Sequence, residues 1–451
     1  MPPHDNVNSS PLPQPVSLAQ AWRYWFRLGW VSFGGPAAQI ALMHRELVQQ
    51  RRWISERRFL HALNYCMLLP GPEAQQLATY IGWLMHRSAG GVVAGVLFVL
   101  PSLLVLMALA WLYLSWGHTA WMTGLFYGIK PAVTAVVLLA AWRMGRRVLH
   151  APVLVAVAVA AFAGVALLGL PFPLIVAAAA LSGHLAARRW PAQFQPGSSF
   201  QGGGRVPHAP ALIDDDTPIP PHARWRAARL WRVLAAGALL WLLPMGALTL
   251  GLGWAHAYTQ MGWFFTKAAL LTFGGAYAVL PYVVQGAVGH YGWLTPAQMM
   301  DGLALGESTP GPLIMVVAFV GFVGGWSQAL LGPESRLLAA VLAALLVTWF
   351  TFLPSFLFIL GGGPLVESSR AMPRLHGPLA AITAAVVGVI LNLALYFGQH
   401  VFWPEAAGGA FDARAALLAV AAGWALGRHQ RGVVEVIAAS AVLGWLLQTL
   451  G

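Results

Sequence analysis

The chain carries one set of helix-breaking motifs twice, and this repeat constrains its fold more than any other feature. Phe33-Gly34-Gly35 recurs as Phe273-Gly274-Gly275, and Pro70-Gly71-Pro72 recurs as Pro310-Gly311-Pro312, with 240 residues between the members of each pair. Two apolar halves interrupted by glycine and proline at matching positions are typical of transporters built from repeats, in which the interruptions mark the substrate site.

The membrane is the expected solvent for most of this chain. The sequence is 58% hydrophobic and only 9% charged, which is too little charge to cover the surface of a soluble protein of 451 residues. Apolar runs of roughly 20 residues recur along it, and they lack the alternation that a barrel strand requires. We therefore predict an all-α polytopic membrane protein with about ten to twelve spans.

The repeat and the composition divide the chain into four parts. Residues 1–17 are polar and rich in proline, and we expect a disordered tail. Residues 18–187 form the first half, and residues 188–223 form a hydrophilic linker with glycine, proline and aspartate clusters. Residues 224–451 form the second half. Two homologous halves of this length indicate duplication and fusion of one ancestral unit.

Loop charges favour opposite membrane orientations for the two halves. The segment from His44 to Arg58 holds five arginines, whereas the matching segment from Val284 to Gln298 holds no lysine or arginine. Positively charged loops stay in the cytoplasm, so the first loop is expected inside and the second is free to lie outside. We predict an inverted repeat. The alternative is that only the first half needs a strong topological signal.

The repeated motifs are expected to break four apolar helices within the membrane and to build the substrate site there. Proline removes a backbone donor and clashes with the preceding turn, and unpaired backbone at membrane depth is tolerated only inside protein or beside a polar cavity. The alternative is that glycine and proline merely kink the helices or let them pack closely. The break residues that we predict to bind substrate are Gly34, Gly35, Pro36, Pro70, Gly71, Pro72, Gly274, Gly275, Thr309, Pro310, Gly311 and Pro312.

Two cations precede the glycine motifs at equivalent positions. Arg27 lies shortly before Gly34, and Lys267 lies at the same distance before Gly274. Charged residues within membrane segments are costly and mark functional sites by default, so both are predicted to help bind an anion. The alternative for each is that its side chain extends to the membrane interface.

The acidic residues near the breaks are not repeated. Glu73 directly follows the first Pro-Gly-Pro motif, whereas Glu307 comes three residues before the second. Either could carry a coupling proton, and Glu73 could instead cap the helix that begins there. Asp301 is expected to be an interfacial residue near the start of a helix.

Several other functions are not indicated by the sequence. It contains no glycine-rich phosphate loop ending in Lys-Ser or Lys-Thr, so ATP-driven transport within this chain is not expected. No histidine pair has metal-ligand spacing, and the single cysteine, Cys66, can form neither an intramolecular disulfide nor a cysteine-based metal site. We predict no cofactor, no metal and no enzymatic activity. The net charge of +12 fits loop arginines that orient helices better than it fits nucleic-acid binding.

Two long blocks resemble the chromate ion transporter family. The block from Phe33 to Trp83 is similar to the N-terminal half of that family, and the block from Thr272 to Ile314 is similar to its C-terminal half. The family's Gly-Gly-Pro motif is met by Gly34, Gly35 and Pro36, whereas Ala276 replaces the proline in the second half. This departure suggests that the two glycine breaks differ in function.

The resemblance implies a multi-pass protein of the bacterial inner membrane that exports chromate, driven by the membrane potential or a proton gradient. Chromate is a tetrahedral dianion shaped like sulfate, so a carrier of sulfate or of another tetrahedral oxyanion is the alternative. A non-transporting membrane scaffold is a third reading, which the intramembrane charges disfavour. Direction, coupling ion and oligomeric state, including a homodimer, stay open at this stage.

Overall fold

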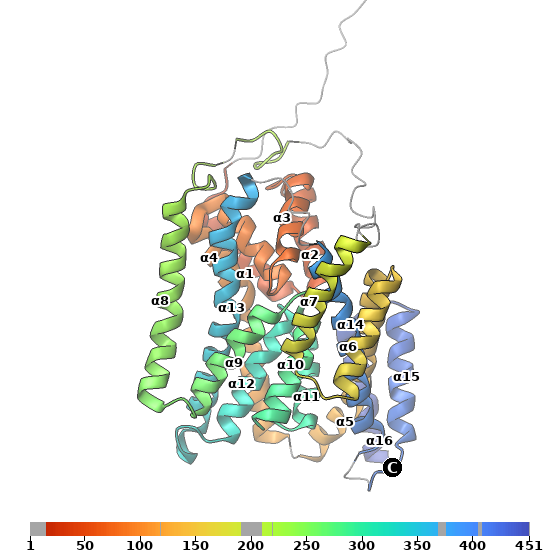
Figure 1. The fold of residues 1–451 in the computed structure, drawn as a ribbon. Coiled ribbons are helices and arrows are strands. Elements are labelled where there is room, and N and C mark those ends of the chain that lie inside the picture. The colour runs from red at the N-terminus through yellow and green to blue at the C-terminus, as the bar shows by residue number, and fades with distance from the viewer. Residues whose placement is uncertain are drawn as a thin grey trace, which may run out of the picture.

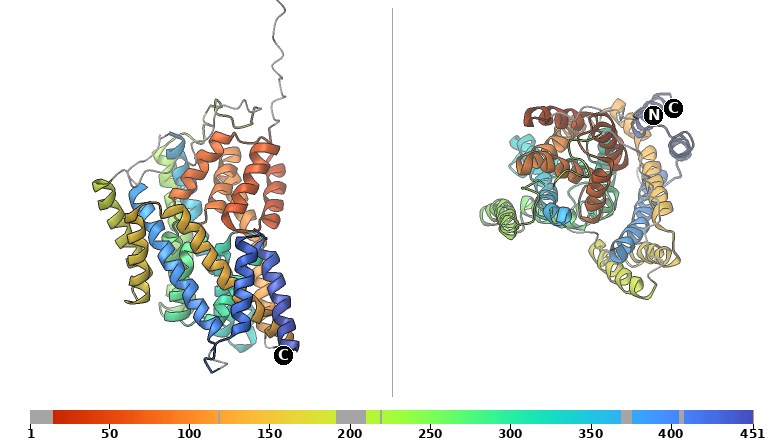
Figure 2. Two further views of the ribbon diagram at one scale, coloured as in Figure 1. Left: turned by 90° about the vertical axis from the view of Figure 1, so that its right-hand side faces the viewer. Right: turned by 90° about the horizontal axis from the view of Figure 1, so that it is seen from above.

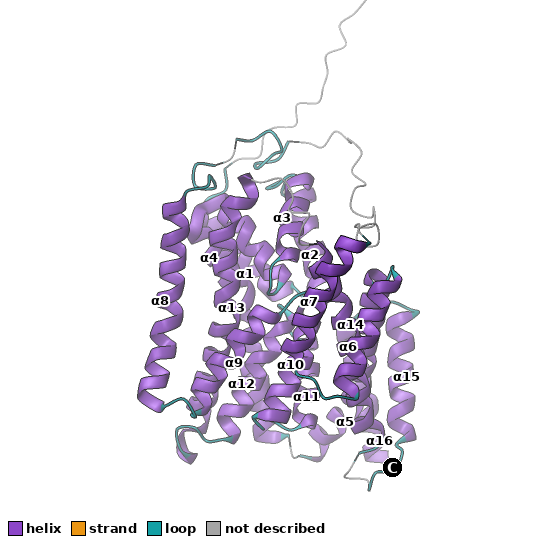
Figure 3. Cartoon of the chain, in the orientation of Figure 1, coloured by secondary structure: helices purple, strands orange, loops and turns teal. Residues whose placement is uncertain are grey.

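The chain folds into a bundle of α-helices in the computed structural model (Figures 1 and 3). The structure describes residues 15–117, 119–190, 210–218, 220–368, 376–404 and 408–450. The predicted disordered tail, 1–17, lies almost entirely outside the described residues, as does most of the predicted linker. The first half extends slightly beyond its predicted end, because α7 continues to Arg189.

The helices of the two halves follow the same order. Those of the first half are α1 (Leu18–Val31), α2 (Gly35–Met43), α3 (Glu56–Leu68), α4 (Glu73–Trp116), α5 (Ala120–Val148), α6 (Pro152–Ala166) and α7 (Phe172–Arg189). Those of the second half are α9 (Ala257–Leu271), α10 (Ala276–Val284), α11 (Pro296–Ser308), α12 (Val316–Ser327), α13 (Arg336–Ser368), α14 (His376–Phe402), α15 (Ala413–Gly427) and α16 (Val433–Leu450). The helix α8 (Ala227–Leu252) follows the linker and has no counterpart in the first half.

The long helix α4 explains why the second half has one more helix than the first. Its backbone leaves the helical region at His86 and Arg87, where the chain kinks between two helical segments. The first segment corresponds to α12 with the 3₁₀ turn η5 (Leu313–Met315), and the second corresponds to α13. The repeat therefore extends through the whole of both halves.

The predicted broken helices are hairpins that enter the bundle from opposite ends. The helices α1, α2 and α3 occupy one end of the bundle, and α9, α10, α11 and α12 occupy the other (Figures 1 and 2). The π-helical turns η1 (His44–Gln50) and η4 (Gln285–His290) extend α2 and α10 toward the two outer surfaces. The loops that differ in arginine content thus lie at opposite ends of the bundle, as an inverted repeat requires.

The helices of the hairpins are shorter than the membrane spans that we predicted from hydropathy. Among the described residues, five helices are long and apolar enough to cross a bilayer: α4, α5, α8, α13 and α14. The apolar runs next to the repeated motifs form shorter helices that end at the breaks, and α6, α12, α15 and α16 are also short. Sequence hydropathy counts apolar residues and does not register that a segment turns back.

The bundle has two layers when it is seen from above. The helices α5, α6, α7, α14, α15 and α16 form a layer beside the remaining helices (Figure 2). The largest core cluster includes buried side chains from both layers, among them Phe172, Met261, Phe319 and Phe397. A second core cluster joins α1, α3 and the first part of α4 around Trp25, Trp83 and Phe59.

The described part of the linker is attached to the arginine-rich loop of the first half. Ile213 forms an isolated parallel bridge with Ile54, and the Ser55 hydroxyl donates to a carboxylate oxygen of Asp215 at 2.6 Å. Arg58 donates to the carbonyl oxygen of Thr217, also at 2.6 Å. These contacts place the linker and the His44–Arg58 segment at the same end of the bundle.

Candidate functional site

The glycine motifs end one helix and begin the next. The helix α1 ends at Val31 and α2 begins at Gly35, with Gly34 at φ +88° and Gly35 at φ +75°. Gly274 and Gly275 have φ values of +82° and +96° between α9 and α10. Only glycine adopts this region without strain, which is why the motif recurs at both turns.

The Pro-Gly-Pro motifs form the second pair of turns. Gly71 has a φ of +125° and Gly311 has a φ of +103°. The proline before each glycine cannot donate to the preceding helix, so α3 ends at Leu68 and α11 ends at Ser308. All four breaks are therefore tips of hairpins, and α2, α4, α10 and η5 with α12 begin at these tips with free N–H groups.

Hydrogen bonds between the halves join the four tips in two pairs. The N–H of Gly71 donates to the carbonyl oxygen of Thr272 at 2.8 Å, and the N–H of Gly311 donates to that of Ser32 at 2.7 Å. Thr272 lies 240 residues after Ser32, as Gly311 does after Gly71, so the two bonds are related by the repeat. Each Pro-Gly-Pro turn thus pairs with the glycine turn of the opposite half.

Two serines from the long helices pack against these turns. Ser102 on α4 lies so close to Gly311 that a Cβ atom there would be 2.6 Å from the Cβ of Ser102. Ser355 on α13 lies against Gly71 in the same way, and it follows Pro354 as Ser102 follows Pro101. Both hydroxyls are buried without a hydrogen-bond partner, so both have a donor to offer to a ligand.

Three glutamines of the first half surround the same turns. The Gln39 amide donates to the carbonyl oxygens of Gly311 at 2.5 Å and Ser32 at 3.2 Å. Gln76 donates to the carbonyl oxygen of Pro70 at 2.8 Å, and Gln75 donates to the hydroxyl of Thr79 at 3.1 Å. The Oε1 atoms of all three glutamines are buried and without a partner. A polar centre therefore lies within an otherwise apolar bundle.

The predicted break residues are brought together, although not all of them offer free groups. Thr309 is buried and its hydroxyl donates to the carbonyl oxygen of Gly306 at 3.0 Å. Pro36 lies in the first turn of α2, and Pro72 and Pro312 directly precede the helical turns that start at Glu73 and Leu313. A proline in these places costs no helical hydrogen bond, because the first N–H groups of a helix are free anyway.

The two predicted acids differ in their surroundings. Glu307 is buried on α11 and accepts a hydrogen bond from the Tyr277 hydroxyl, which comes from the first turn of α10. Glu73 is half-buried at the first position of α4, and the charge of Arg147 on α5 acts on its carboxyl group. Both acids lie next to breaks, so both can respond to a ligand bound there.

The two predicted cations lie away from the polar centre. Arg27 is exposed on the face of α1 that also carries Trp22, Phe26 and Trp30. Lys267 is half-buried, and its ammonium group lies 5.7 Å from the ring centroid of Trp263, one turn earlier on α9. A cation over a tryptophan ring is attracted by the ring's negative face.

An arginine-rich hollow lies beside the breaks and is the main feature that sequence reasoning missed. Its volume is about 680 Å³, and no acidic residue is among the described residues that line it. Arg143 donates to the carbonyl oxygen of Leu426 at 3.1 Å and thereby joins α5 to the end of α15. The described residues that line the hollow are Leu139, Trp142, Arg143, Arg146, Arg147, Gly427 and Arg428.

One turn of α5 contacts both the hollow and a glycine break. The methyl group of Met144 lies 3.1 Å from the position of a Cβ at Gly274, beside Thr383 of α14. The charge of Arg143 acts on Tyr277, the partner of Glu307, and that of Arg147 acts on Glu73. In the sequence, arginines at the end of an apolar segment are explained by their effect on membrane topology. The sequence therefore did not indicate that these arginines lie near the breaks.

Asp301 is also placed differently from the interfacial position expected for it. Its side chain is 3% exposed, lies 3.7 Å from the Lys130 ammonium group and accepts a hydrogen bond of 2.9 Å from the Tyr113 hydroxyl. The pair joins α11 to α5 across the two layers. Burying a carboxylate is costly, and pairing it with lysine offsets that cost.

Comparisons with known proteins agree with the two-half arrangement. A family model described as "Chromate transporter" matches residues 19–184 and again residues 259–445. A "Chromate transport protein" of Pseudomonas aeruginosa is 33% identical over 98% of this chain and 95% of its own length. A protein of the same name from Cupriavidus metallidurans is 29% identical over 85% and 83%, respectively. An uncharacterized transporter of Methanocaldococcus jannaschii is 22% identical over 84% of both chains. No solved structure shows a significant match.

Proposed function

The chain belongs to the chromate transporter family, and from this premise we propose that it is a secondary active transporter that exports chromate across the bacterial inner membrane, driven by the proton motive force. The resemblance seen in the sequence is thereby confirmed at the level of the family. Transport of chromate is supported by the names of the relatives that match nearly the whole chain.

The observation that carries the proposal is the pair of cross-half hydrogen bonds, Gly71 to Thr272 and Gly311 to Ser32. They join the four hairpin tips in two pairs, beside buried polar groups of which the Ser102 and Ser355 hydroxyls have no partner. Substrate sites of transporters with inverted repeats lie where discontinuous helices of the two halves meet. We therefore propose that the anion binds at this polar centre.

The chemistry of the centre suits a tetrahedral dianion. Helices that begin at the breaks direct N–H groups and the positive ends of their dipoles toward the tips. The hydroxyls of Ser102 and Ser355 add two donors, one from each half and each beside a Pro-Gly-Pro turn. Donors that were fixed before the anion arrives do not need to reorganise when it binds, and this lowers the cost of removing its water shell.

Positive charge for the dianion is proposed to come from two sources. Arg143, Arg146, Arg147 and Arg428 gather the anion in the hollow, because a concave surface lined by one sign of charge raises the local concentration of the opposite ion. Arg27 and Lys267 are proposed to help admit the anion rather than to contact it at the tips, since the Arg27 side chain is exposed and the Lys267 ammonium group lies over the ring of Trp263.

Glu73 and Glu307 are the proposed proton carriers. Glu307 has a hydrogen-bond partner in Tyr277 on α10, and Glu73 directly follows the first Pro-Gly-Pro turn, where the charge of Arg147 acts on it. Protonation of either acid would remove a negative charge next to the anion site. Proton binding and anion affinity are thereby linked.

Sulfate or another tetrahedral oxyanion is the alternative substrate, because the same donors fit any of them. The test is uptake of labelled chromate and of labelled sulfate into inverted membrane vesicles, with and without an imposed pH gradient. We expect gradient-dependent chromate uptake that exceeds sulfate uptake. Faster uptake of sulfate than of chromate would contradict the proposal and support a sulfate carrier. No uptake of either anion would favour a membrane scaffold.

A further inference from the structure

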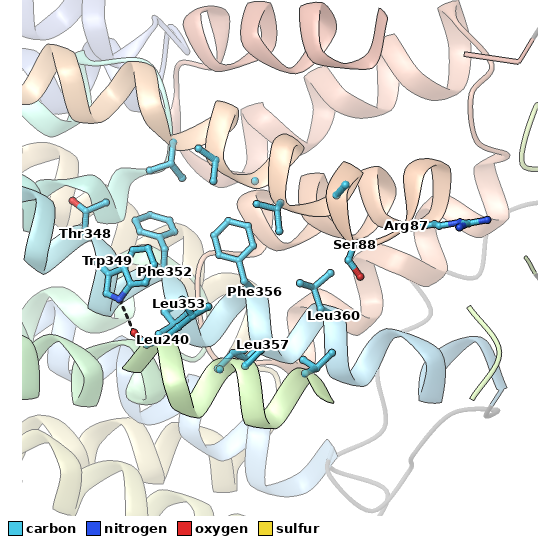
Figure 4. Close-up of a pocket in the computed structure, with 18 of the residues that line it drawn as sticks. Arg87, Ser88, Leu240, Thr348, Trp349, Phe352, Leu353, Phe356, Leu357 and Leu360 are labelled. Carbon is cyan, nitrogen blue, oxygen red and sulfur yellow. Dashed lines mark hydrogen bonds between the residues drawn. The ribbon is translucent and has the colours of Figure 1, made fainter. Parts of the chain in front are cut away.

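A long apolar groove runs between α8 and the helices α4 and α13 (Figure 4). Its volume is about 860 Å³, and its walls come from the second segment of α4, from α8 and from α13. Arg87 and Leu103, both lining residues on α4, are about 24 Å apart along the helix axis at 1.5 Å per residue. One leaflet of the hydrocarbon core is about 15 Å deep, so an acyl chain fits within the groove.

The helices α8 and α13 contact each other at a glycine and through one side-chain hydrogen bond. Gly237 of α8 lies against Leu357 of α13, where a Cβ would be 2.6 Å from a leucine methyl group. Near the other end of the groove, the Trp349 indole N–H donates to the carbonyl oxygen of Leu240 at 3.1 Å and joins α13 to α8 (Figure 4). The helix α8 is thereby attached to α13 while its α4-facing side stays open.

The end of the groove at the linker side is basic. Arg87, Arg229 and Arg232 line it, and no acidic residue is among the described residues that line the groove. Arg229 is already engaged, since it donates to the His222 carbonyl oxygen and to the Ser88 hydroxyl and lies over the Trp83 ring. Arg87 and Arg232 are exposed, and Figure 4 shows Arg87 and Ser88 at the opposite end from Thr348 and Trp349.

His222 lines this basic end but does not add a positive charge to it. Burial, together with the nearby charges of Arg229 and Arg87, lowers the pKa of His222, and its ring contacts the Trp83 carbonyl oxygen at 3.0 Å. The positive charge of this end therefore rests on the three arginines.

We propose that this groove binds one anionic phospholipid, with an acyl chain along α4 and α13 and the phosphate group beside Arg87 and Arg232. A long apolar channel with a basic end matches the division of such a lipid into apolar tail and negative head. The basic end lies on the same side of the bundle as the arginine-rich loop that we expect in the cytoplasm (Figure 1), where anionic headgroups attract basic segments. The bound lipid would fill the space between α8 and the bundle.

The test uses the purified full chain, delipidated in detergent, and native mass spectrometry with phosphatidylglycerol or phosphatidylcholine of identical acyl chains. We expect one tightly bound phosphatidylglycerol per chain and weaker binding of phosphatidylcholine. The double variant Arg87→Gln/Arg232→Gln should bind phosphatidylglycerol roughly 20-fold more weakly, at about fivefold for each arginine near the headgroup. The matched control is Arg224→Gln/Arg226→Gln, which removes two exposed arginines near the start of α8 that do not line the groove.

A second variant tests the acyl part independently of charge. Ala236→Phe places a ring in the groove from α8 and should weaken both lipids alike, while the melting temperature reports whether the chain is folded. Equal binding of the two lipids by the wild-type chain, or no loss in the double arginine variant relative to its control, would overturn the proposal. Displacement of the lipid by millimolar inorganic phosphate alone would also overturn it, because the site would then bind a free anion.

Discussion

The N–H of Gly71 donates a hydrogen bond of 2.8 Å to the carbonyl oxygen of Thr272, which belongs to the opposite half of the chain. The bond from Gly311 to Ser32 repeats this relationship with the halves exchanged. Neither glycine could make its bond from a continuous helix, because both amides would then point along the helix axis. The prolines that break the helices therefore free the amides that connect the halves.

The first prediction concerns the space at these glycines. Gly311→Ala should destabilise the protein by about 2 kcal/mol or more, since alanine is strained at a φ of +103° and its methyl group would overlap Ser102. Thermal unfolding in detergent measures the loss. Gly246→Ala on α8 is the control, because nothing lies within 4 Å of its added methyl group, and it should be neutral or slightly stabilising. Equal melting temperatures for both variants would contradict the packing described at the tips.

The second prediction concerns the unpartnered hydroxyls. Ser102→Ala and Ser355→Ala remove buried hydroxyls that have no hydrogen-bond partner, so stability should change by less than about 1 kcal/mol. Chromate affinity should fall roughly tenfold for each, as expected when one hydrogen bond to a charged group is lost. Calorimetric titration provides the affinities. Thr351→Val serves as control, since its hydroxyl is buried but bonded to the Val347 carbonyl oxygen. Unchanged affinity in both serine variants would place the anion elsewhere.

How much of this site was predictable depends on the range of the interactions involved. The breaks at Gly34 and Gly71 are local, because glycine and proline act on their own backbone, and their repetition was visible in the sequence. The pairing of Gly71 with Thr272 joins positions about 200 residues apart in the chain, and spacing alone does not reveal which tips meet.

The helical segments themselves were also only partly predictable. Hydropathy predicted apolar spans along the chain, but it did not show that the apolar runs beside the breaks turn back on themselves. The kink at His86 and Arg87 lies in a sequence without proline and just before Ser88 and Gly90, so hydropathy alone did not locate it. Arg143 and Arg147 were visible only as positive charges at the end of a span.

The third prediction tests the membrane orientation of the halves. Single cysteines at Gln50 and Gly289 in a Cys66→Ser background should differ in labelling by a membrane-impermeant thiol reagent applied to whole cells. Both positions are exposed and lie in the π-helical turns η1 and η4 at opposite ends of the bundle, whereas Cys66 is buried. We expect labelling at residue 289 and protection at residue 50, in accordance with the five arginines of the first loop. Equal labelling of both positions would contradict the inverted arrangement.

The fourth prediction concerns the acids. If Glu73 or Glu307 carries the coupling proton, replacing it by glutamine should abolish export driven by a pH gradient and leave anion binding largely intact. Tyr277→Phe removes the hydrogen bond to Glu307 and should alter the pH dependence of export without abolishing it. Vesicle uptake at several imposed gradients measures both effects. Normal pH dependence in both glutamine variants would leave the two acids with structural roles only.

The last prediction compares how much Arg147, Arg27 and Lys267 each contribute to chromate affinity. A dianion inside the membrane requires compensating positive charge, because the cost of burying it unpaired is many kcal/mol. Arg147 lies in the hollow and acts on Glu73, so Arg147→Gln should weaken chromate binding about tenfold, and the loss should shrink as ionic strength rises. Arg27→Gln and Lys267→Gln should lower the rate of transport more than they lower affinity, because their side chains lie away from the tips. Arg147→Lys should lower chromate affinity less than Arg147→Gln does, since the charge survives although the bidentate geometry is lost.

Calorimetric titration of the four variants at two salt concentrations measures chromate affinity. Uptake rates measured in parallel show whether a variant changes the entry of the anion rather than its binding. A large loss of affinity for Arg27→Gln together with wild-type affinity for Arg147→Gln would reverse the ranking and move the site of charge compensation to the outer face of α1.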